Sequence, residues 1–340
     1  MKIMENIFIS ICIPNYKRPK ELMRLLNTID SQLYNEIEIV VCDDKSPNAD
    51  EIRKVADEFA AESKYRFVFV ENEQNCGYDK NLRELIKKAT GEWIVFMGND
   101  DEFVADSLDK LIRFLKSNEK IGYVLKSHYF IHKNNKPEIF KYYETDKYFE
   151  AGVNAYINLF RKSVFISGFT IRRRFITDLL IDKFDGTLLF QLYLLAEVCL
   201  NHPSAYFDMP LTQQYDEGTP EFGSSINEKG ITPGTITVEN SLRFLKGYFI
   251  ITKYIDDKYG FESTKRIKLD MSKYFYPSLA IQRSKGLLIF LGYVSQLNKI
   301  GFNVSKYYYI YVIGLVIFGK RICDNVIRIL KNVIGKTPKL

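Results

Sequence analysis

Residues 9–18 read Ile-Ser-Ile-Cys-Ile-Pro-Asn-Tyr-Lys-Arg, an apolar and largely β-branched run that stops at a proline. Such a run predicts a buried strand, because β-branched side chains suit the pleated surface of a sheet. Pro14 has no backbone N–H and marks the point where the strand gives way to a loop. That loop contains no glycine, so it does not match the GxGxxG turn of dinucleotide-binding folds.

Outward from this strand, apolar runs alternate with amphipathic helices over the first 130 residues. Further strands are predicted at residues 37–42, 65–70, 92–97 and 121–125, and helices at residues 20–31, 50–62, 80–89 and 107–116. Nearly continuous apolar strands separated by such helices predict an α/β fold, in which a Rossmann-like, mostly parallel sheet carries helices on both faces. Ligands bind such sheets at the carboxyl ends of the strands.

The rest of the chain divides into a loop-rich stretch and a helical one. Glycine and proline are concentrated at residues 210–233, which predicts a long mobile loop, and the residues after 238 show helical periodicity. We therefore expect one domain over residues 1–236 and a helical, membrane-associating region over residues 237–340.

The composition excludes several classes of protein. A net charge of +6 over 340 residues is too small to indicate a nucleic-acid partner. The five cysteines are widely spaced without a CxxC pair, so neither a disulfide framework nor a zinc site is predicted. A cytoplasmic location is therefore expected. The apolar stretch at residues 307–319 spans roughly 20 Å as a helix, which is shorter than a hydrocarbon core of about 30 Å.

Two of the loops at predicted strand ends carry paired carboxylates, Asp43-Asp44 and Asp100-Asp101. Adjacent acids repel each other unless a cation or a hydrogen-bond donor compensates them, so a divalent metal is a natural inference. For either pair alone, the alternative is an aspartate that caps the following turn. That alternative weakens when both pairs lie on the same edge of one sheet.

Four stretches in this order resemble the family 2 glycosyltransferases with the GT-A fold. They are residues 9–18, residues 39–46 (Ile-Val-Val-Cys-Asp-Asp-Lys-Ser), residues 75–77 (Asn-Cys-Gly) with Asn81, and residues 91–101 (Gly-Glu-Trp-Ile-Val-Phe-Met-Gly-Asn-Asp-Asp). The resemblance covers roughly the first 130 residues and, more loosely, the chain to about residue 216. It implies a nucleotide-diphosphate sugar donor of the UDP, dTDP or GDP type, a Mn²⁺ or Mg²⁺ cofactor, and transfer with inversion by one in-line displacement.

The resemblance also implies roles for individual residues. Pro14 and Tyr16 would flank the nucleobase, and Asp44 would accept a hydrogen bond from an imino N–H of uracil, thymine or guanine. Asp100 would lie near the ribose and Asp101 would bind the metal, although Asn99 stands where the family often has a leading aspartate. The residues expected to bind the nucleotide are Pro14, Asn15, Tyr16, Arg18, Asp44, Lys80 and Asp100, with Arg18, Lys80 and Lys17 as candidates for the phosphates.

An inverting transfer also needs a general base that takes the proton from the acceptor hydroxyl. The family commonly uses the Asp of a Glu-Asp pair, which this chain lacks. The nearest equivalent is Phe184-Asp185-Gly186-Thr187, so Asp185 is the candidate catalytic base, and its alternative role is an N-cap or turn aspartate. Further candidates are Asp182 and Glu217 for the base and Gln191 for contact with acceptor or donor.

Residues 281–340 contain ten Lys or Arg and one acid, Asp324. Apolar segments followed by a basic amphipathic helix favour an interfacial position on an anionic membrane surface, and the alternative is an ordinary packed helical subdomain. The first reading predicts a protein that is peripheral on the inner face of the plasma membrane. Its acceptor would be a saccharide, expected to be lipid-linked, in O-antigen or capsule synthesis.

The chain lacks the QxxRW signature of processive polymer synthases, which favours transfer of a single sugar. Two other functions compete. A sugar-phosphate nucleotidyltransferase would want a glycine-rich, basic loop after the first strand, and residues 14–18 contain no glycine. A non-catalytic, membrane-docked binding protein with a degenerate transferase domain is kept open by Asn99 and by the missing Glu-Asp pair.

Overall fold

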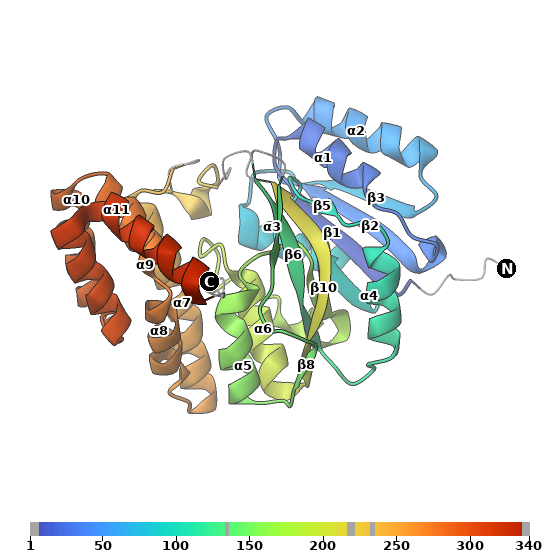
Figure 1. The fold of residues 1–340 in the computed structure, drawn as a ribbon. Coiled ribbons are helices and arrows are strands. Elements are labelled where there is room, and N and C mark those ends of the chain that lie inside the picture. Colours follow the sequence, from blue (N-terminus) through green and yellow to red (C-terminus); the bar gives the residue numbers. More distant parts are fainter. Residues whose placement is uncertain (1–6, 133–135, 216–221, 232–234, 335–340) are drawn as a thin grey trace. The chain divides into compact units, whose positions relative to one another are not determined.

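The computed structural model describes residues 7–132, 136–215, 222–231 and 235–334 of the chain (Figure 1). The chain divides into two compact units, Met1–Lys229 and Gly230–Leu340. The boundary expected between residues 236 and 237 lies a few residues beyond this division. The first unit is α/β and the second is helical, so the predicted fold class is confirmed.

The described part of the first unit contains a ten-stranded sheet, in the order β3-β2-β1-β4-β9-β6-β10-β5 with β7 beside β6 and β8 beside β10. Its parallel half consists of β1 (Ile9–Asn15), β2 (Ile37–Asp43), β3 (Arg66–Glu71) and β4 (Trp93–Phe96). The other strands are β5 (Glu102–Phe103), β6 (Tyr123–Ile131), β7 (Pro137–Phe140), β8 (Lys147–Phe149), β9 (Phe169–Arg172) and β10 (Ser204–Tyr215). Because β9 runs antiparallel to both β4 and β6, the sheet is parallel over its first four strands and mixed beyond them.

Strand β10 corrects one expectation from the sequence. A loop is predicted from residue 210, but β10 continues to Tyr215. The register of β10 against β6 shifts on both sides of Pro210, which marks an irregularity of the bulge type. Bulges tolerate proline because the ladder is already interrupted there. The loop prediction was therefore wrong for residues 210–215, and its residues 216–221 and 232–234 lie outside the described part of the chain.

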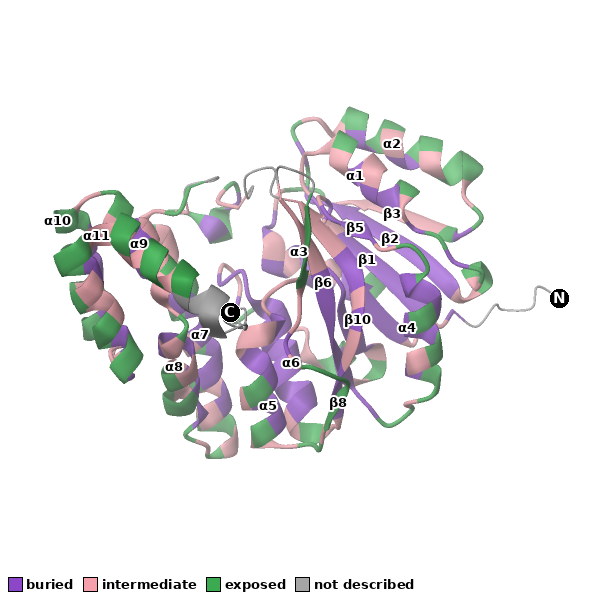
Figure 2. Ribbon diagram, viewed as in Figure 1, coloured by how far each residue is buried: buried purple, intermediate pink, exposed green. Residues whose placement is uncertain are grey.

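Helices cover both faces of the sheet. On one face, α1 (Pro19–Asn27), α2 (Ala49–Glu62) and α4 (Ser107–Lys116) share an apolar core with the strands, in which alternate β1 residues from Ile9 to Ile13 are buried (Figure 2). Away from this cluster, α3 (Tyr78–Lys88) packs on β1 and β2 and also on α6 (Phe190–Asn201), which contacts α5 (Val153–Phe160). This two-sided cover leaves the carboxyl ends of β1, β2 and β4 free to carry loops.

The second unit consists of α7 (Val238–Tyr259), α8 (Ser263–Lys273), α9 (Tyr276–Ser284), α10 (Leu287–Lys299) and α11 (Lys306–Ile334). The side chain of Thr237 accepts a hydrogen bond from the Asn240 N–H and so caps the start of α7. Gly319, at φ +69°, interrupts the helical backbone of α11 and kinks it. Within the described residues, no helix combines the length and the apolar character that a membrane span requires.

Candidate functional site

The site lies where the loops after β1, β2 and β4 meet, and Asn15 joins them. The Asn15 Nδ2 donates to Asp43 Oδ1 at 2.8 Å, and its Oδ1 accepts from Asn99 Nδ2 at 2.8 Å. Asn15 itself is buried. The two acidic stretches, 43–44 and 99–101, are therefore brought to one edge of the sheet, as the parallel strand order predicts.

Asp43 and Asp44, the first acidic pair, bind different segments of the chain. Asp43 accepts hydrogen bonds from the backbone N–H and the hydroxyl of Ser46, at 2.9 and 2.6 Å, so the turn-capping alternative holds for Asp43. Asp44 accepts from the backbone N–H groups of Cys76 and Gly77, at 2.9 and 2.8 Å, and from Asn72 Nδ2 at 2.9 Å. Asp44 thus fastens the β3–α3 loop to the end of β2, and its contact with a nucleobase stays a prediction.

Gly77 is required at this junction for two reasons. Its φ of +85° belongs to the left-handed region that side chains disfavour, and a Cβ at this position would lie 2.5 Å from Ser225 Oγ. Asn81 of α3 donates to the Cys42 carbonyl at 3.0 Å, so the loop is held at both ends. The Asn-Cys-Gly motif therefore shapes the backbone that Asp44 binds.

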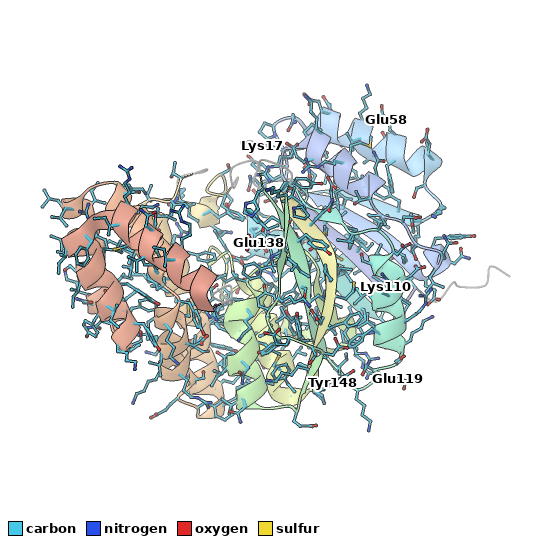
Figure 3. All side chains as sticks on the ribbon, in the orientation of Figure 1. Lys17, Glu58, Lys110, Glu119, Glu138 and Tyr148 are labelled. Carbon is cyan, nitrogen blue, oxygen red and sulfur yellow. The ribbon has the colours of Figure 1, made fainter. Side chains whose placement is uncertain are left out.

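The end of β1 and the loop after it carry four of the residues expected to bind the nucleotide. Pro14, Tyr16 and Arg18 are partly exposed, and the Lys17 ammonium lies 5.2 Å from the centroid of the Tyr16 ring. Figure 3 labels Lys17 among the side chains drawn on the ribbon. Lys17 and Arg18 have φ values of +59° and +60°. Left-handed backbone at two consecutive non-glycine residues is strained, and such strain is concentrated at functional loops.

The second acidic pair differs strongly in exposure. The Asp100 side chain is 39% exposed and forms an ion pair with Arg18, whereas Asp101 is buried and accepts a hydrogen bond from the Ser167 hydroxyl. Burial, together with the charge of Asp100, raises the pKa of Asp101 to about 8. Ser167, on the loop before β9, is a site residue that the sequence did not indicate.

This pair fits a divalent cation. Burial and the charge of Asp100 disfavour the ionised form of Asp101, and a bound cation would compensate both effects. Among the described residues there is no group of three or more His, Cys, Asp or Glu side chains placed to hold a metal. One or two carboxylates are the usual protein share of a Mg²⁺ site in which substrate phosphates provide the other ligands.

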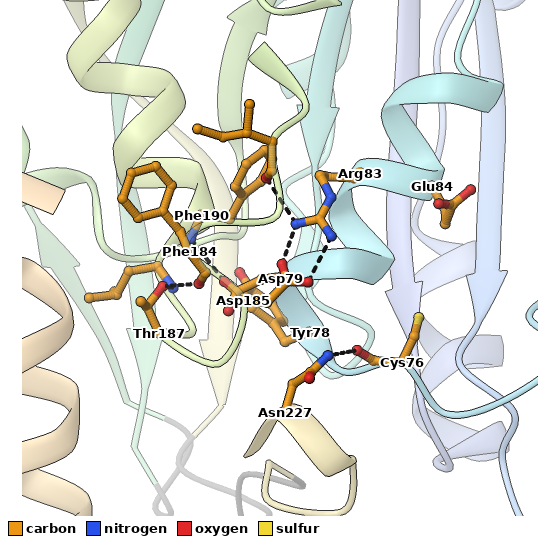
Figure 4. Close-up of polar contacts among 12 residues, drawn as sticks. Cys76, Tyr78, Asp79, Arg83, Glu84, Phe184, Asp185, Thr187, Phe190 and Asn227 are labelled. Carbon is orange, nitrogen blue, oxygen red and sulfur yellow. Dashed lines mark hydrogen bonds and ion pairs between the residues drawn. The ribbon is translucent and has the colours of Figure 1, made fainter. Parts of the chain in front are cut away.

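Asp185, the candidate base, belongs to a different cluster, which Figure 4 shows. It forms a two-pronged ion pair with Arg83 of α3, with Nη2 to Oδ2 at 2.8 Å, and Arg83 also donates to the Ile181 carbonyl at 3.1 Å. The Asp185 side chain is 18% exposed and that of Arg83 is 6% exposed. The ion pair anchors the loop before α6 to α3.

Asp79 of α3 caps the start of α6. Its carboxylate accepts from the backbone N–H groups of Leu188 and Phe190, both at 2.9 Å. Burial raises the pKa of Asp79 to about 7. The N-cap role considered for Asp185 is therefore performed by Asp79, from another helix. Asp79 and Arg83, which both bind the loop before α6, lie four residues apart on one face of α3, and this spacing is the signal for them that the sequence offers.

Residues 223–228, which follow β10, contact the β3–α3 loop and the start of α3. Glu228 accepts from the Tyr78 N–H and the Gly223 N–H, both at 2.8 Å, and Asn227 Nδ2 donates to the Cys76 carbonyl at 3.2 Å. Part of the predicted mobile loop is thus bonded to the β3–α3 loop. Glu217, a further candidate base, lies outside the described residues.

The remaining candidates lie apart from these contacts. Gln191 is buried in α6 and donates to the Val164 carbonyl at 3.2 Å, Lys80 is partly exposed in the first turn of α3, and Asp182 is exposed. Their contacts with acceptor, donor or phosphate stay predictions.

A family model described as "Glycosyl transferase family 2" matches residues 10–179, which is half of the chain and includes both acidic pairs. The chain belongs to glycosyl transferase family 2. The resemblance stated from its motifs is therefore confirmed.

Curated relatives of this family 2 chain are themselves described as glycosyltransferases. An uncharacterized glycosyltransferase of Methanocaldococcus jannaschii is 26% identical over 43% of this chain and 52% of its own length. The abequosyltransferase RfbV of Salmonella typhimurium is 30% identical over 34% of each chain. A Campylobacter jejuni relative, 26% identical over 34% of this chain and 36% of its own, is named as a GalNAc(5)-diNAcBac-PP-undecaprenol β-1,3-glucosyltransferase. The matches span between a third and about half of these relatives' lengths.

Solved structures extend the likeness in fold over more of the family 2 chain. Residues 1–349 of Staphylococcus aureus TarS, in complex with UDP-GlcNAc, match 95% of this chain and 92% of that one, with a TM-score of 0.51 and 15% identity. GalNAc-T7 with UDP, GalNAc and Mn²⁺ matches 79% of this chain and 51% of its own, with a TM-score of 0.52 and 14% identity. The expected GT-A fold is confirmed.

Proposed function

We propose that this family 2 protein transfers one sugar from a nucleotide-diphosphate sugar to a hydroxyl group of a saccharide. The observation that carries the proposal is the joining of the strand-end loops through Asn15, which gathers Asp44, Asp100 and Asp101 at one edge of the sheet. Relatives named as glycosyltransferases support the same activity.

In this proposal the transfer is inverting and depends on Mn²⁺ or Mg²⁺. Asp101, with Asp100 beside it, would hold the cation, whose positive charge would stabilise the departing nucleoside diphosphate. Asp44 orients the β3–α3 loop and the nucleobase of the donor, and Arg18 and Lys80 face the donor's phosphates. Asp185 takes the proton of the acceptor hydroxyl as the new glycosidic bond forms and the bond from the sugar to the diphosphate oxygen breaks.

For the acceptor we propose a lipid-linked saccharide used in surface polysaccharide synthesis. Two relatives support this class, since the Campylobacter jejuni protein and an Escherichia coli β-1,3-glucosyltransferase are both named for diphosphoundecaprenol substrates. We propose accordingly that the protein works in the cytoplasm, against the inner face of the plasma membrane. A donor of the UDP type is favoured within this proposal, because TarS and GalNAc-T7 were both solved with UDP or a UDP sugar.

The test is thermal stabilisation of the full chain by UDP, GDP, dTDP and CDP, each with and without Mn²⁺. A diphosphate present at 100 times its dissociation constant adds about 2.7 kcal/mol of stability. We expect one of the first three to stabilise only with Mn²⁺, and Asp101→Asn to abolish that effect. Asp106→Asn is the matched control, because Asp106 is exposed and asparagine tolerates its φ of +58°.

A second candidate function is a non-catalytic binding protein. It is favoured by two observations, the asparagine at position 99 and the ion pair that engages Asp185 with Arg83. A diphosphate that stabilises the chain without any sugar transfer would support this candidate, whereas turnover of a nucleotide sugar would eliminate it. If no diphosphate stabilises the wild type or the Asp101→Asn variant, the transferase proposal fails.

A further inference from the structure

The second unit leaves large apolar side chains in solvent on two successive helices. On α10, Leu288 is 84% exposed, and on α11 Ile317 and Phe318 are 65% and 57% exposed. We call these residues, with Leu291, Ile313 and Val316, the apolar face. Much of α10 and α11 is accordingly coloured as exposed in Figure 2. Contiguous apolar surface of this kind marks a site of interaction with protein or membrane.

Both helices pack on α9, and Arg283 of α9 also bonds to the backbone of α11. Arg283, four residues before α10 begins, donates from Nε to the Leu315 carbonyl of α11 at 2.9 Å. A Cβ on Gly319 would also lie 3.6 Å from the Arg283 guanidinium. Arg283 therefore links the turn before α10 to residues 315–319 of α11. On each helix the exposed residues follow one stripe, because Leu288 and Leu291 are three positions apart and Ile313 and Ile317 are four.

Beyond the kink at Gly319, the same helix becomes basic and amphipathic. Ile322, Val326 and Ile329 are exposed at successive turns, and Arg321 and Arg328 follow a neighbouring stripe. Residues 281–329 contain seven Lys or Arg and a single acid, Asp324. Asp324 is already paired with Lys320 at 2.5 Å and bonded to the Tyr276 hydroxyl at 2.6 Å. The segment that carries the apolar face therefore has an excess of positive charge.

We propose that the apolar face and the basic half of α11 dock on an anionic lipid bilayer. Apolar side chains would enter the boundary between headgroups and acyl chains, while Arg321 and Arg328 would meet anionic headgroups. Charge decides against a second copy of the chain, because joining two such faces would bring like charges together. The inference rests on the proposed function, in which the acceptor is held in a membrane.

The experiment measures co-sedimentation of the full chain with vesicles of phosphatidylcholine, and with vesicles of equal parts phosphatidylcholine and phosphatidylglycerol. We expect the anionic vesicles to bind roughly tenfold more tightly or better, since each basic residue near the surface contributes about fivefold. Leu288→Asp and Ile317→Asp, on separate helices, should each weaken that binding by about tenfold or more. Ile139→Asp in β7 is the control, because Ile139 is an apolar residue 41% exposed in the first unit.

Three results would overturn the proposal: equal binding to both vesicle types, unchanged binding of both variants, or an equal loss with Ile139→Asp. A dimer that forms without lipid and that Ile317→Asp dissociates would assign the face to a second copy instead. Melting temperatures close to that of the wild type establish that the variants are folded. Stabilisation by diphosphate with Mn²⁺ needs no vesicle, so failure of membrane docking and failure of the proposed transfer are separately visible.

Discussion

At the scale of single residues, the ion pair between Arg83 and Asp185 raises the question of what Asp185 does. Removing one partner leaves the other charge buried without its partner, which costs about 3–5 kcal/mol. We expect Asp185→Asn to lower the melting temperature, and the double variant Arg83→Met/Asp185→Asn to recover much of the loss. If Asp185 is the base, transfer stays reduced by about 100-fold to 10,000-fold in both.

Activity of the double variant separates the two roles of Asp185. Recovery of transfer together with stability would mean that Asp185 only anchors the loop before α6. Asp178→Asn is the matched control, because Asp178 lies seven residues away, is exposed, and should retain transfer.

Asp79 makes the stability of the fold depend on pH. Burial raises its pKa to about 7, so the folded state holds this proton more tightly than the unfolded chain does. The stabilisation is complete below the unfolded pKa of about 4 and is lost as the pH rises through about 7. Asp79→Asn should therefore gain stability relative to the wild type as the pH rises over this window, in denaturant titrations at a series of pH values. Exposed Asp178→Asn should show no such trend, and a parallel course for Asp79→Asn and wild type would contradict the assignment.

At the scale of elements, the start of α3 depends on the close approach of residues 222–229. Gly77→Ala would place a methyl group against Ser225 and force a left-handed alanine, so we expect a loss of about 1–3 kcal/mol and weaker diphosphate stabilisation. Gly260→Ala is the control, since Gly260 has a φ of +72° with open space around it. It carries the backbone cost without the clash. Equal losses in the two variants, measured by denaturant unfolding, would show that the approach to Ser225 does not matter.

Most of these elements could be predicted from local patterns in the sequence. The strand predicted at residues 37–42 is β2 (Ile37–Asp43), and the helix predicted at residues 107–116 is α4 (Ser107–Lys116). Their periodicity is set by burial on one face, which the sequence displays directly. The insertion of β9 between β4 and β6 could not be predicted, because four residues carry no signal for their partner strands.

The candidate site, like the fold, could be predicted from the sequence only in part. Sequence order is enough to gather the loops of Asp43-Asp44 and Asp100-Asp101, because parallel strands end at one edge. The contacts of Ser167 with Asp101 and of Asp79 with the start of α6 join residues 66 and about 110 positions apart. These contacts join residues that are distant in the sequence, so neither the spacing nor the type of the residues predicts them.

At the scale of the whole molecule, the chain separates two kinds of surface chemistry. The acidic loops belong to Met1–Lys229, whereas the last helices of Gly230–Leu340 carry the excess of basic residues. The sequence shows this asymmetry in its charge distribution alone. What required the structure is the finding that the apolar side chains of α10 and α11 remain exposed instead of packing into a core.

The position of β9 between β4 and β6 also determines the order in which the strands can pair during synthesis. The strands β1 to β4 all lie within the first 96 residues, so they can pair as β3-β2-β1-β4 before the later strands have been made. The free edge of β4 then waits for residues 169–172, and β6 waits both for these and for β10. During synthesis the part of the sheet that bears Asp44 can therefore be assembled first, while Asp101 acquires its partner Ser167 only after residue 167 has been made. Pairings this distant in sequence are slow to form, so an unpaired strand edge persists in the nascent protein.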